Sequence, residues 1–514
     1  MKELCRTVGV QADRRKDIYK LLVKPTQISF DENKTVSCDA FLPLYTSFYP
    51  NTLGDVMKSL SQLIGNTSGD EAALSQLYLP LISLPLEPSE LAEMTTSLIN
   101  RYIPLIVRSD ENVTKGFCTL FTQLLQYHCP TIANKLTETR ADLDQFILNA
   151  LCTLGMILGE SIQDKLKILD NIILSADQLI HVFLILAHVL SLKDAIASST
   201  SADAILKVCK SPIASSEITT VFAFARALSG TTPISITKQI YSCITNAAQY
   251  QRWVYQTVTT STVSVVSPKD ILNDRGMRGF NLLFVDVRPK EDYINGTIPG
   301  AINLDGEQFQ RDPETSIKVL KDLEMVKETV THIVIFGTSD HRNTTEQTQQ
   351  VIMWLIKNGF PHVSELHNGF TGYHYLFDNE KGFNIENHSL TGCSICRKQG
   401  KESLNQFIKT TESVGSKAFE FAKGWFGTAM ASMTVNQQKP VPETKEAVQT
   451  TSPQPTVTET APESVQSQHL VEHSETHPDQ NTKEVNRDES KVSDEFEQLM
   501  KTELHMNGEI QGES

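Results

Sequence analysis

The chain has 514 residues, of which 40% are hydrophobic, and its formal net charge is -15. That length is enough for two or three domains of ordinary size, each able to bury its own core. The negative charge excludes nucleic acid as a main partner, because phosphate binding needs a basic surface. Residues 439–514 contain sixteen acidic and six basic residues, so they hold ten of the fifteen net negative charges.

Cysteine usage and hydropathy indicate the compartment. The nine cysteines are scattered without the spacing of a disulfide framework, and their odd number suits a reducing compartment. Met1 to Tyr19 lacks the apolar stretch of a signal peptide, and the longest apolar run, Leu179 to Leu190, is too short to span a bilayer. We therefore expect a cytoplasmic protein in which this run is a buried core helix, with His181 and His188 in packing roles.

Residues 1–255 follow a helical pattern. Apolar residues recur at three- and four-residue spacing, as in Leu120, Leu124 and Leu125. Prolines such as Pro80 and Pro130 give turn signals between the helical segments, and strand-like alternation is scarce. The pattern predicts an all-α domain over residues 1–255 and a linker over residues 256–265.

The pattern changes in residues 266–390. Leu282 to Val287 and His332 to Phe336 are short, continuous apolar runs bounded by polar turns, which is typical of buried parallel strands. Helical stretches lie between and after them, notably Thr345 to Asn358. Strands that alternate with helices predict a small α/β domain over residues 266–390.

A different kind of segment follows. We expect residues 391–402 to be a linker and residues 403–433 to form an amphipathic helix, whose apolar face includes Phe407, Phe421, Trp425 and Phe426. Three roles for this helix stay open: it inserts into a membrane surface, packs in a partner's groove, or folds back on the α/β domain.

The last part of the chain, residues 434–514, is rich in Pro, Thr, Ser, Gln and Glu. Such a composition cannot bury a core, so we expect a disordered acidic tail. Residues 492–506 form a short amphipathic island within it. This island is either a short linear motif, whose partner the sequence does not identify, or inert tail.

The α/β domain carries a motif. The chain reads Val285-Asp286-Val287-Arg288-Pro289 after the first predicted strand and then Gly296-Thr297-Ile298-Pro299-Gly300. This order resembles the first signature of rhodanese domains. An acidic and a basic residue at the end of a strand can form a buried ion pair, and the glycines and proline shape a tight return. The signature positions are Asp286, Arg288, Gly296, Pro299 and Gly300.

The reactive residue of that family is missing. An active rhodanese carries a cysteine directly after the next central strand, in a Cys-x-x-Gly-x-Arg loop that stabilises a thiolate. Here the strand ends at Phe336, Gly337 occupies the cysteine's position, and Arg342 alone remains of the loop pattern. The resemblance thus implies a rhodanese-like fold without sulfur transfer. Ser339 stays open as a substitute nucleophile, although the sequence places no base beside it.

The helical domain resembles the TBC domain of Rab GTPase-activating proteins, whose active members use an arginine and a glutamine finger. Arg15-Lys16-Asp17-Ile18-Tyr19 looks like the family's opening Arg-x-x-x-Trp, with Tyr in place of Trp. The arginine motif aligns with Val36 to Leu42 and ends in Leu42, and the glutamine motif falls near Asp70. Because an aspartate repels phosphate, the resemblance implies a domain without GTPase-activating chemistry.

Both resemblances in this order are similar to a family of TBC–rhodanese vesicle-tethering adaptors at the trans-Golgi network. The resemblance implies a non-enzymatic adaptor, without cofactor or metal, that binds golgin N-terminal segments on endosome-derived vesicles. It also implies a peripheral location at the trans-Golgi network, with membrane contact through residues 403–433. The family's C-terminal PH-like domain, which recruits the WASH complex, has no expected counterpart here, because the acidic tail stands in its place.

Other functions stay open. A Rab GTPase-activating protein would need a displaced finger, for which Arg14, Arg15 and Arg101 are available. A Rab effector without hydrolysis, and a sulfurtransferase or phosphatase, are the remaining alternatives.

The pair Cys393 and Cys396, spaced Cys-x-x-Cys, has three readings: half a zinc site, a redox pair, or two incidental loop cysteines. No second Cys or His pair follows them at ligand spacing. We therefore expect incidental cysteines.

Overall fold

The computed structural model describes residues 9–25, 71–106, 111–245, 261–279, 281–312, 331–338 and 346–398, together with a few single positions. Several sequence predictions lie outside the described residues. They concern Leu42, Asp70, Ser339, Arg342, the segment 403–433 with Phe407, Phe421, Trp425 and Phe426, and the tail 434–514 with its motif 492–506.

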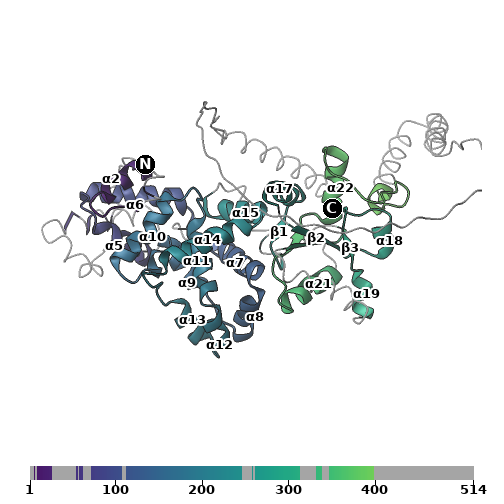
Figure 1. Ribbon diagram of the computed structural model, residues 1–514, viewed down its shortest axis with the longest axis horizontal. Helices are drawn as coiled ribbons and strands as arrows, with labels where there is room; N and C mark the ends of the chain where they lie inside the picture. The colour runs from purple at the N-terminus through teal and green to yellow at the C-terminus, as the bar shows by residue number, and fades with distance from the viewer. Residues whose placement is uncertain are drawn as a thin grey trace, which may run out of the picture. The chain divides into compact units, whose positions relative to one another are not determined.

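The described residues before residue 246 are mainly helical, as predicted, and are drawn in purple to teal in Figure 1. Pro88 and Pro130 occupy the first turns of two helices, where a missing N–H costs nothing. Pro80 does not end a helix as expected but lies inside one. The helices are α2 (Arg15–Val23), α5 (Glu71–Ile82), α6 (Pro88–Tyr102), α7 (Glu111–His128), α8 (Pro130–Thr139), α9 (Asp144–Cys152), α10 (Ile162–Leu174), α11 (Ile180–Ser191), α12 (Lys193–Ser198), α13 (Ala202–Cys209), α14 (Ile218–Thr231) and α15 (Ile234–Thr245).

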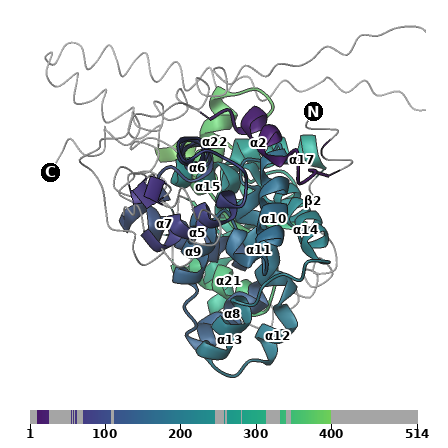
Figure 2. The same cartoon turned by 90° about the vertical axis from the view of Figure 1, so that its left-hand side faces the viewer.

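Helix α11 is the centre of this region and packs against α9 and α14 (Figure 2). All its residues from Ile180 to Leu190 are buried, which confirms the predicted core helix. His181 is fully buried with its ring edge toward Tyr102, and His188 meets the carbonyl oxygen of Cys209 at 2.9 Å. Among the described helices, none is long and apolar enough to cross a membrane.

The α/β region contains a five-stranded parallel sheet of order β1-β5-β4-β2-β3. Its strands are β1 (Val265–Val266), β2 (Asn281–Asp286), β3 (Ile302–Asn303), β4 (Thr331–Phe336) and β5 (Val363–Leu366). Its helices are α17 (Pro268–Arg278), α18 (Lys290–Ile294), α19 (Gly306–Arg311), α21 (Glu346–Lys357) and α22 (Gly369–Asn379). The predicted strands and the predicted helix over 345–358 are present within one residue or two of their expected bounds.

Helices cover both faces of this sheet, which is why its central strands are apolar on both sides. Figure 1 shows α17 and α22 on one side and α19 and α21 on the other. Phe336 of β4 packs in the same core as Phe370 of α22, whereas Ile335 packs with Val351 and Leu355 of α21. Successive residues of a strand therefore supply two separate cores.

The helical and α/β regions contact each other directly. The backbone N–H of His362 donates to the carbonyl oxygen of Tyr127 at 2.6 Å, and Asn134 Nδ2 donates to the carbonyl oxygen of Ile356 at 2.9 Å. On a second side, Asp270 of α17 accepts from Ser235 and Lys238 of α15, both at 3.0 Å.

The α/β region extends beyond residue 390, so the predicted linker 391–402 is wrong in its first part. Cys393 and Ile395 are buried in the core, and residues 394–398 are helical. The carbonyl oxygen of Asn295 accepts from the N–H of Ser389 at 3.2 Å, which fixes the start of this segment. The buried side chains of Cys393 and Ile395 hold this segment against the domain.

Candidate functional site

The first candidate site is the loop that leaves β4, where a rhodanese carries its nucleophile. The carbonyl oxygen of Gly337 accepts a hydrogen bond from the N–H of Phe370 at 2.9 Å. The carbonyl oxygen of Thr338 accepts from the N–H of Thr371 at 2.9 Å and from its Oγ1 at 2.6 Å. The first two residues of the loop are therefore bonded to the first turn of α22.

The space beside Gly337 is occupied. A Cβ atom at this position would lie 3.0 Å from Oγ1 of Thr348, a residue of α21 that is 1% exposed. That distance is shorter than an ordinary van der Waals contact. A side chain at this position would therefore need a small displacement of Thr348.

The predicted ion pair at the end of β2 is present. Arg288 and Asp286 are 2% and 0% exposed, and their closest nitrogen and oxygen atoms are 2.6 Å apart. Arg288 also donates to the carbonyl oxygen of Gly296 at 2.7 Å, and its guanidinium lies 3.7 Å from the ring centroid of Phe370. Thr297 completes the set by donating to Asp286 at 2.8 Å. Arg288 therefore braces the loop and presents no free face to an anion.

The signature turn has the expected shape. Gly296 and Gly300 have φ angles of 146° and 75°, which favour glycine. Pro299 and Gly300 are exposed at the tip of the turn, and the N–H of Gly300 donates to Oε2 of Glu386 at 3.2 Å. These residues shape the backbone and contribute no reactive group.

In the helical domain, Arg15 has a structural role. It is 5% exposed and forms a two-pronged contact with Asp170, with nitrogen–oxygen distances of 2.8 and 3.0 Å. Tyr19, in place of the family's tryptophan, is fully buried and donates to the same carboxylate at 2.6 Å. Burial, aided by Asp170, raises the pKa of Tyr19 well above its usual value, so its hydroxyl stays protonated.

The other two arginines considered as fingers differ in exposure. Arg101 donates to the carbonyl oxygen of Leu22 at 3.2 Å and lies 5.3 Å from the ring centroid of its neighbour Tyr102. The side chain of Arg14 is 70% exposed and lies 3.8 Å from Asp13. Of the three, Arg14 alone has a largely exposed guanidinium, and it stands next to an acidic residue.

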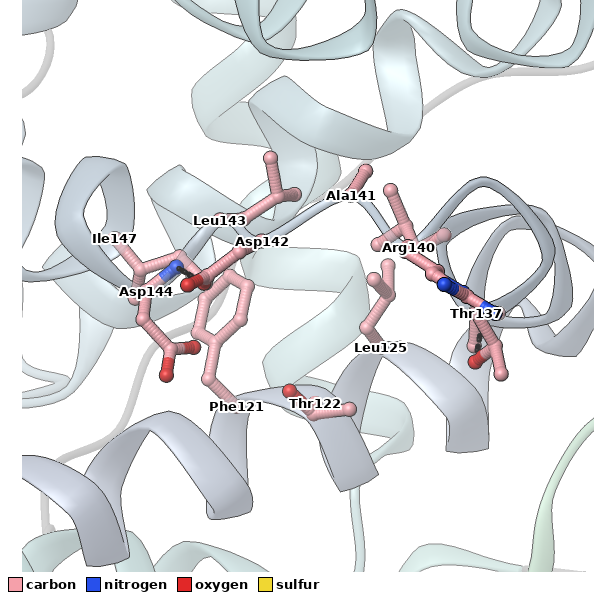
Figure 3. A pocket seen from close by; sticks show the side chains of 12 residues that line it. Phe121, Thr122, Leu125, Thr137, Arg140, Ala141, Asp142, Leu143, Asp144 and Ile147 are labelled. Atoms are coloured by element: carbon pink, nitrogen blue, oxygen red, sulfur yellow. Dashed lines mark hydrogen bonds between the residues drawn. The ribbon is translucent and has the colours of Figure 1, made fainter. Parts of the chain in front are cut away.

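A pocket of about 200 Å³ opens between α7, α8 and α9 of the helical domain (Figure 3). Phe121 and Leu125 line its floor, while Arg140, Asp142 and Asp144 lie along its rim. Ligand pockets usually measure about 300–1,000 Å³, so this one is small for a nucleotide. Two carboxylates beside one guanidinium also disfavour a phosphate group.

A further group of side chains was missed by the sequence analysis. Cys393 and Cys396 lie together with His374 and His388, so they are not the two isolated loop cysteines that the sequence led us to expect. The second pair of potential ligands precedes the cysteines in the chain rather than following them. A search for His and Cys on both sides of the Cys-x-x-Cys would have found it.

The comparisons with known proteins agree with this fold. A family model for the Rab-GTPase-TBC domain matches residues 72–197, and one for the rhodanese-like domain matches residues 269–375. A tRNA uridine(34) hydroxylase of Buchnera aphidicola (subspecies Schizaphis graminum) is 24% identical over 151 residues, which are 26% of this chain and 44% of that protein. The chain thus spans less than half the length of this relative. With the rhodanese-like match following the TBC match, the chain has a TBC–rhodanese architecture.

Proposed function

We propose that this protein is a non-catalytic adaptor in endosome-to-Golgi vesicle tethering that binds golgin N-terminal segments through its TBC and rhodanese-like domains. The two domains indicate a role in vesicle traffic or with Rab GTPases. The observation that carries the proposal is Gly337, which stands where a rhodanese nucleophile belongs, against a buried Thr348. A domain kept without its nucleophile serves best as a binding surface.

The buried arginines of the two domains support the same proposal. Arg288 is held by Asp286 and Phe370, and Arg15 is held by Asp170. A GTPase-activating arginine is worth about 10³- to 10⁵-fold in rate only when it reaches the γ-phosphate. An arginine that already pairs with a buried carboxylate, as Arg15 does, cannot reach a γ-phosphate.

The α/β domain offers an apolar spot for a golgin segment. Ile294 and Leu390 are 55% and 69% exposed, and a hydrogen bond between Asn295 and Ser389 joins the two stretches that carry them. Exposed apolar side chains on neighbouring stretches favour an interaction surface more than singly scattered ones do. We expect the apolar face of a golgin helix to cover this pair.

Binding of the full chain to immobilised golgin N-terminal peptides tests the proposal. We expect capture by at least one peptide, and a loss of affinity of about tenfold or more in the double variant I294D/L390D, since a central apolar contact is worth about 2 kcal/mol. M353D, at another exposed apolar residue, is the matched control and should bind normally. Failure to bind any golgin peptide would refute the adaptor function.

A Rab effector is the second candidate, since the TBC domain indicates a relationship with Rab GTPases. A pulldown with a panel of GTP-locked Rabs separates the two functions. Retention of a GTP-loaded Rab without golgin capture would favour the effector. Membrane contact through residues 403–433, a partner of the tail and a trans-Golgi location remain predictions.

A further inference from the structure

Two histidines and two cysteines converge beside α22, and the adaptor function makes no use of them. Sγ of Cys396 lies 3.3 Å from Nε2 of His374 and 3.4 Å from Nε2 of His388, and the two Nε2 atoms are 3.1 Å apart. With Sγ of Cys393 included, all four atoms lie within 4.8 Å of one another. The four side chains therefore face a common centre.

This spacing is that of a tetrahedral metal site. Zinc binds thiolate sulfur at about 2.3 Å and imidazole nitrogen at about 2.0 Å, so tetrahedral ligands lie about 3.3 Å apart for two nitrogens and about 3.6 Å for nitrogen and sulfur. Mixed thiolate and imidazole donors suit zinc among the common divalent ions. Four protein ligands leave no open position, which is the arrangement of a structural site.

The surroundings of His374 resemble those of a metal-binding histidine. Its Nδ1 lies 3.0 Å from Oδ2 of Asp378, one helical turn along α22. A carboxylate beside one ring nitrogen orients the imidazole and turns the lone pair of the other nitrogen toward a metal. His374 is 1% exposed and Cys393 is 2% exposed, so half of the cluster is removed from water.

The backbone holds the two cysteines and His388 in place. The N–H of Cys393 donates to the carbonyl oxygen of Ser389 at 2.6 Å. A Cβ atom on Gly392 would lie 2.0 Å from Oδ1 of Asn295, and one on Gly296 would lie 3.4 Å from the ring of His388. Glycines at both positions thus let the signature turn and the Cys-x-x-Cys segment approach each other closely.

We infer that His374, His388, Cys393 and Cys396 bind one structural zinc ion that fastens the segment after the sheet to α22. A redox disulfide explains the geometry less well. It would need only the two thiols, and it gives no reason for two imidazole nitrogens to meet each other and a sulfur at hydrogen-bond distance.

Metal analysis of the purified full chain tests the site. We expect about one zinc per chain by mass spectrometry, and its loss in the double variant C393S/C396S. C129S, which removes a partly exposed thiol outside the cluster, is the matched control and should keep its zinc. D378N should retain the ion but bind it about 10- to 100-fold more weakly.

Cobalt substitution of the unmodified chain gives a readout that does not depend on the variants folding. We expect the visible bands of tetrahedral Co²⁺ together with a thiolate charge-transfer band. Zinc below about a tenth of an ion per chain after incubation with Zn²⁺, zinc kept by C393S/C396S, octahedral cobalt spectra, or a Cys393–Cys396 disulfide would each overturn the inference.

Discussion

Two sites of the rhodanese-like domain lie against helix α22, and they differ in how clearly the sequence indicates them. The loop after β4 is located by the recognisable signature that follows β2, but it has Gly337 at the position of the family's cysteine, and the nearby Arg288 is engaged by a carboxylate and a ring. The cluster around Cys393 has half a motif in sequence, yet four ligand atoms in space. The order of residues in a motif is therefore a poor guide to which side chains come together in space.

Removal of the zinc ion should have the largest effect on stability. An ion that binds only the folded state adds about 4 kcal/mol when its free concentration is about 1,000 times the Kd. A strong chelator should therefore lower the Tm of the wild-type chain in differential scanning calorimetry. The same chelator should leave the Tm of C393S/C396S unchanged. An equal shift in both proteins would show that the cluster binds no stabilising ion.

Loss of Arg288 should have an effect of similar size. Arg288→Ala leaves the buried Asp286 without its cation, and breaking a buried pair costs about 3–5 kcal/mol. Urea denaturation measures this as a shift of the midpoint. Lys269→Ala, which breaks a partly exposed pair with Glu380, should cost less than about 1 kcal/mol. Similar costs for the two variants would show that Arg288 does not brace the loop.

Acid should weaken the fold through two buried histidines, one in the helical domain and one in the α/β region. Burial lowers the pKa of His181 to about 3 and that of His362, at the contact between the domains, to about 4. Below about pH 6.5 these histidines bind protons in the unfolded chain but stay neutral in the folded chain. The free energy of unfolding therefore decreases as the pH falls from about 6.5 to 4. Each group contributes up to about 1.4 kcal/mol per pH unit. Denaturation curves at several pH values check this slope, and His181→Leu should flatten it.

Restoring a thiol at the end of β4 should have the smallest effect. Gly337→Cys places a Cβ atom 3.0 Å from Oγ1 of Thr348, and overpacking of this kind costs about 1–3 kcal/mol. The double variant G337C/T348A should regain much of that loss in thermal unfolding. A Gly337→Cys variant as stable as the wild type would show that the space for the thiol is still present.

Much of the α/β fold could be predicted because its signals are local. The apolar runs ending at Val287 and Phe336 gave strands β2 and β4, since a strand buried on both faces must be apolar throughout. The ion pair of Asp286 and Arg288 spans two residues of one motif and was equally visible.

The contacts that could not be predicted join residues far apart in the chain. Asp170 meets Arg15 across 155 residues, and nothing near either one indicates the partner. His374 and His388 precede Cys393 by only 19 and 5 residues, so the sequence offers them as candidates, but only the packing of this segment against α22 shows that the four side chains meet. Tertiary packing, rather than spacing, decides such sites.

Single-turnover GTP hydrolysis on a panel of Rab GTPases, with the full chain added in excess, tests the central claim that these domains bind without catalysing. We expect every Rab to hydrolyse GTP at its intrinsic rate, with or without the protein. Hydrolysis of any Rab's GTP that rises about 10³-fold or more and falls back in Arg14→Ala or Arg101→Ala would contradict it.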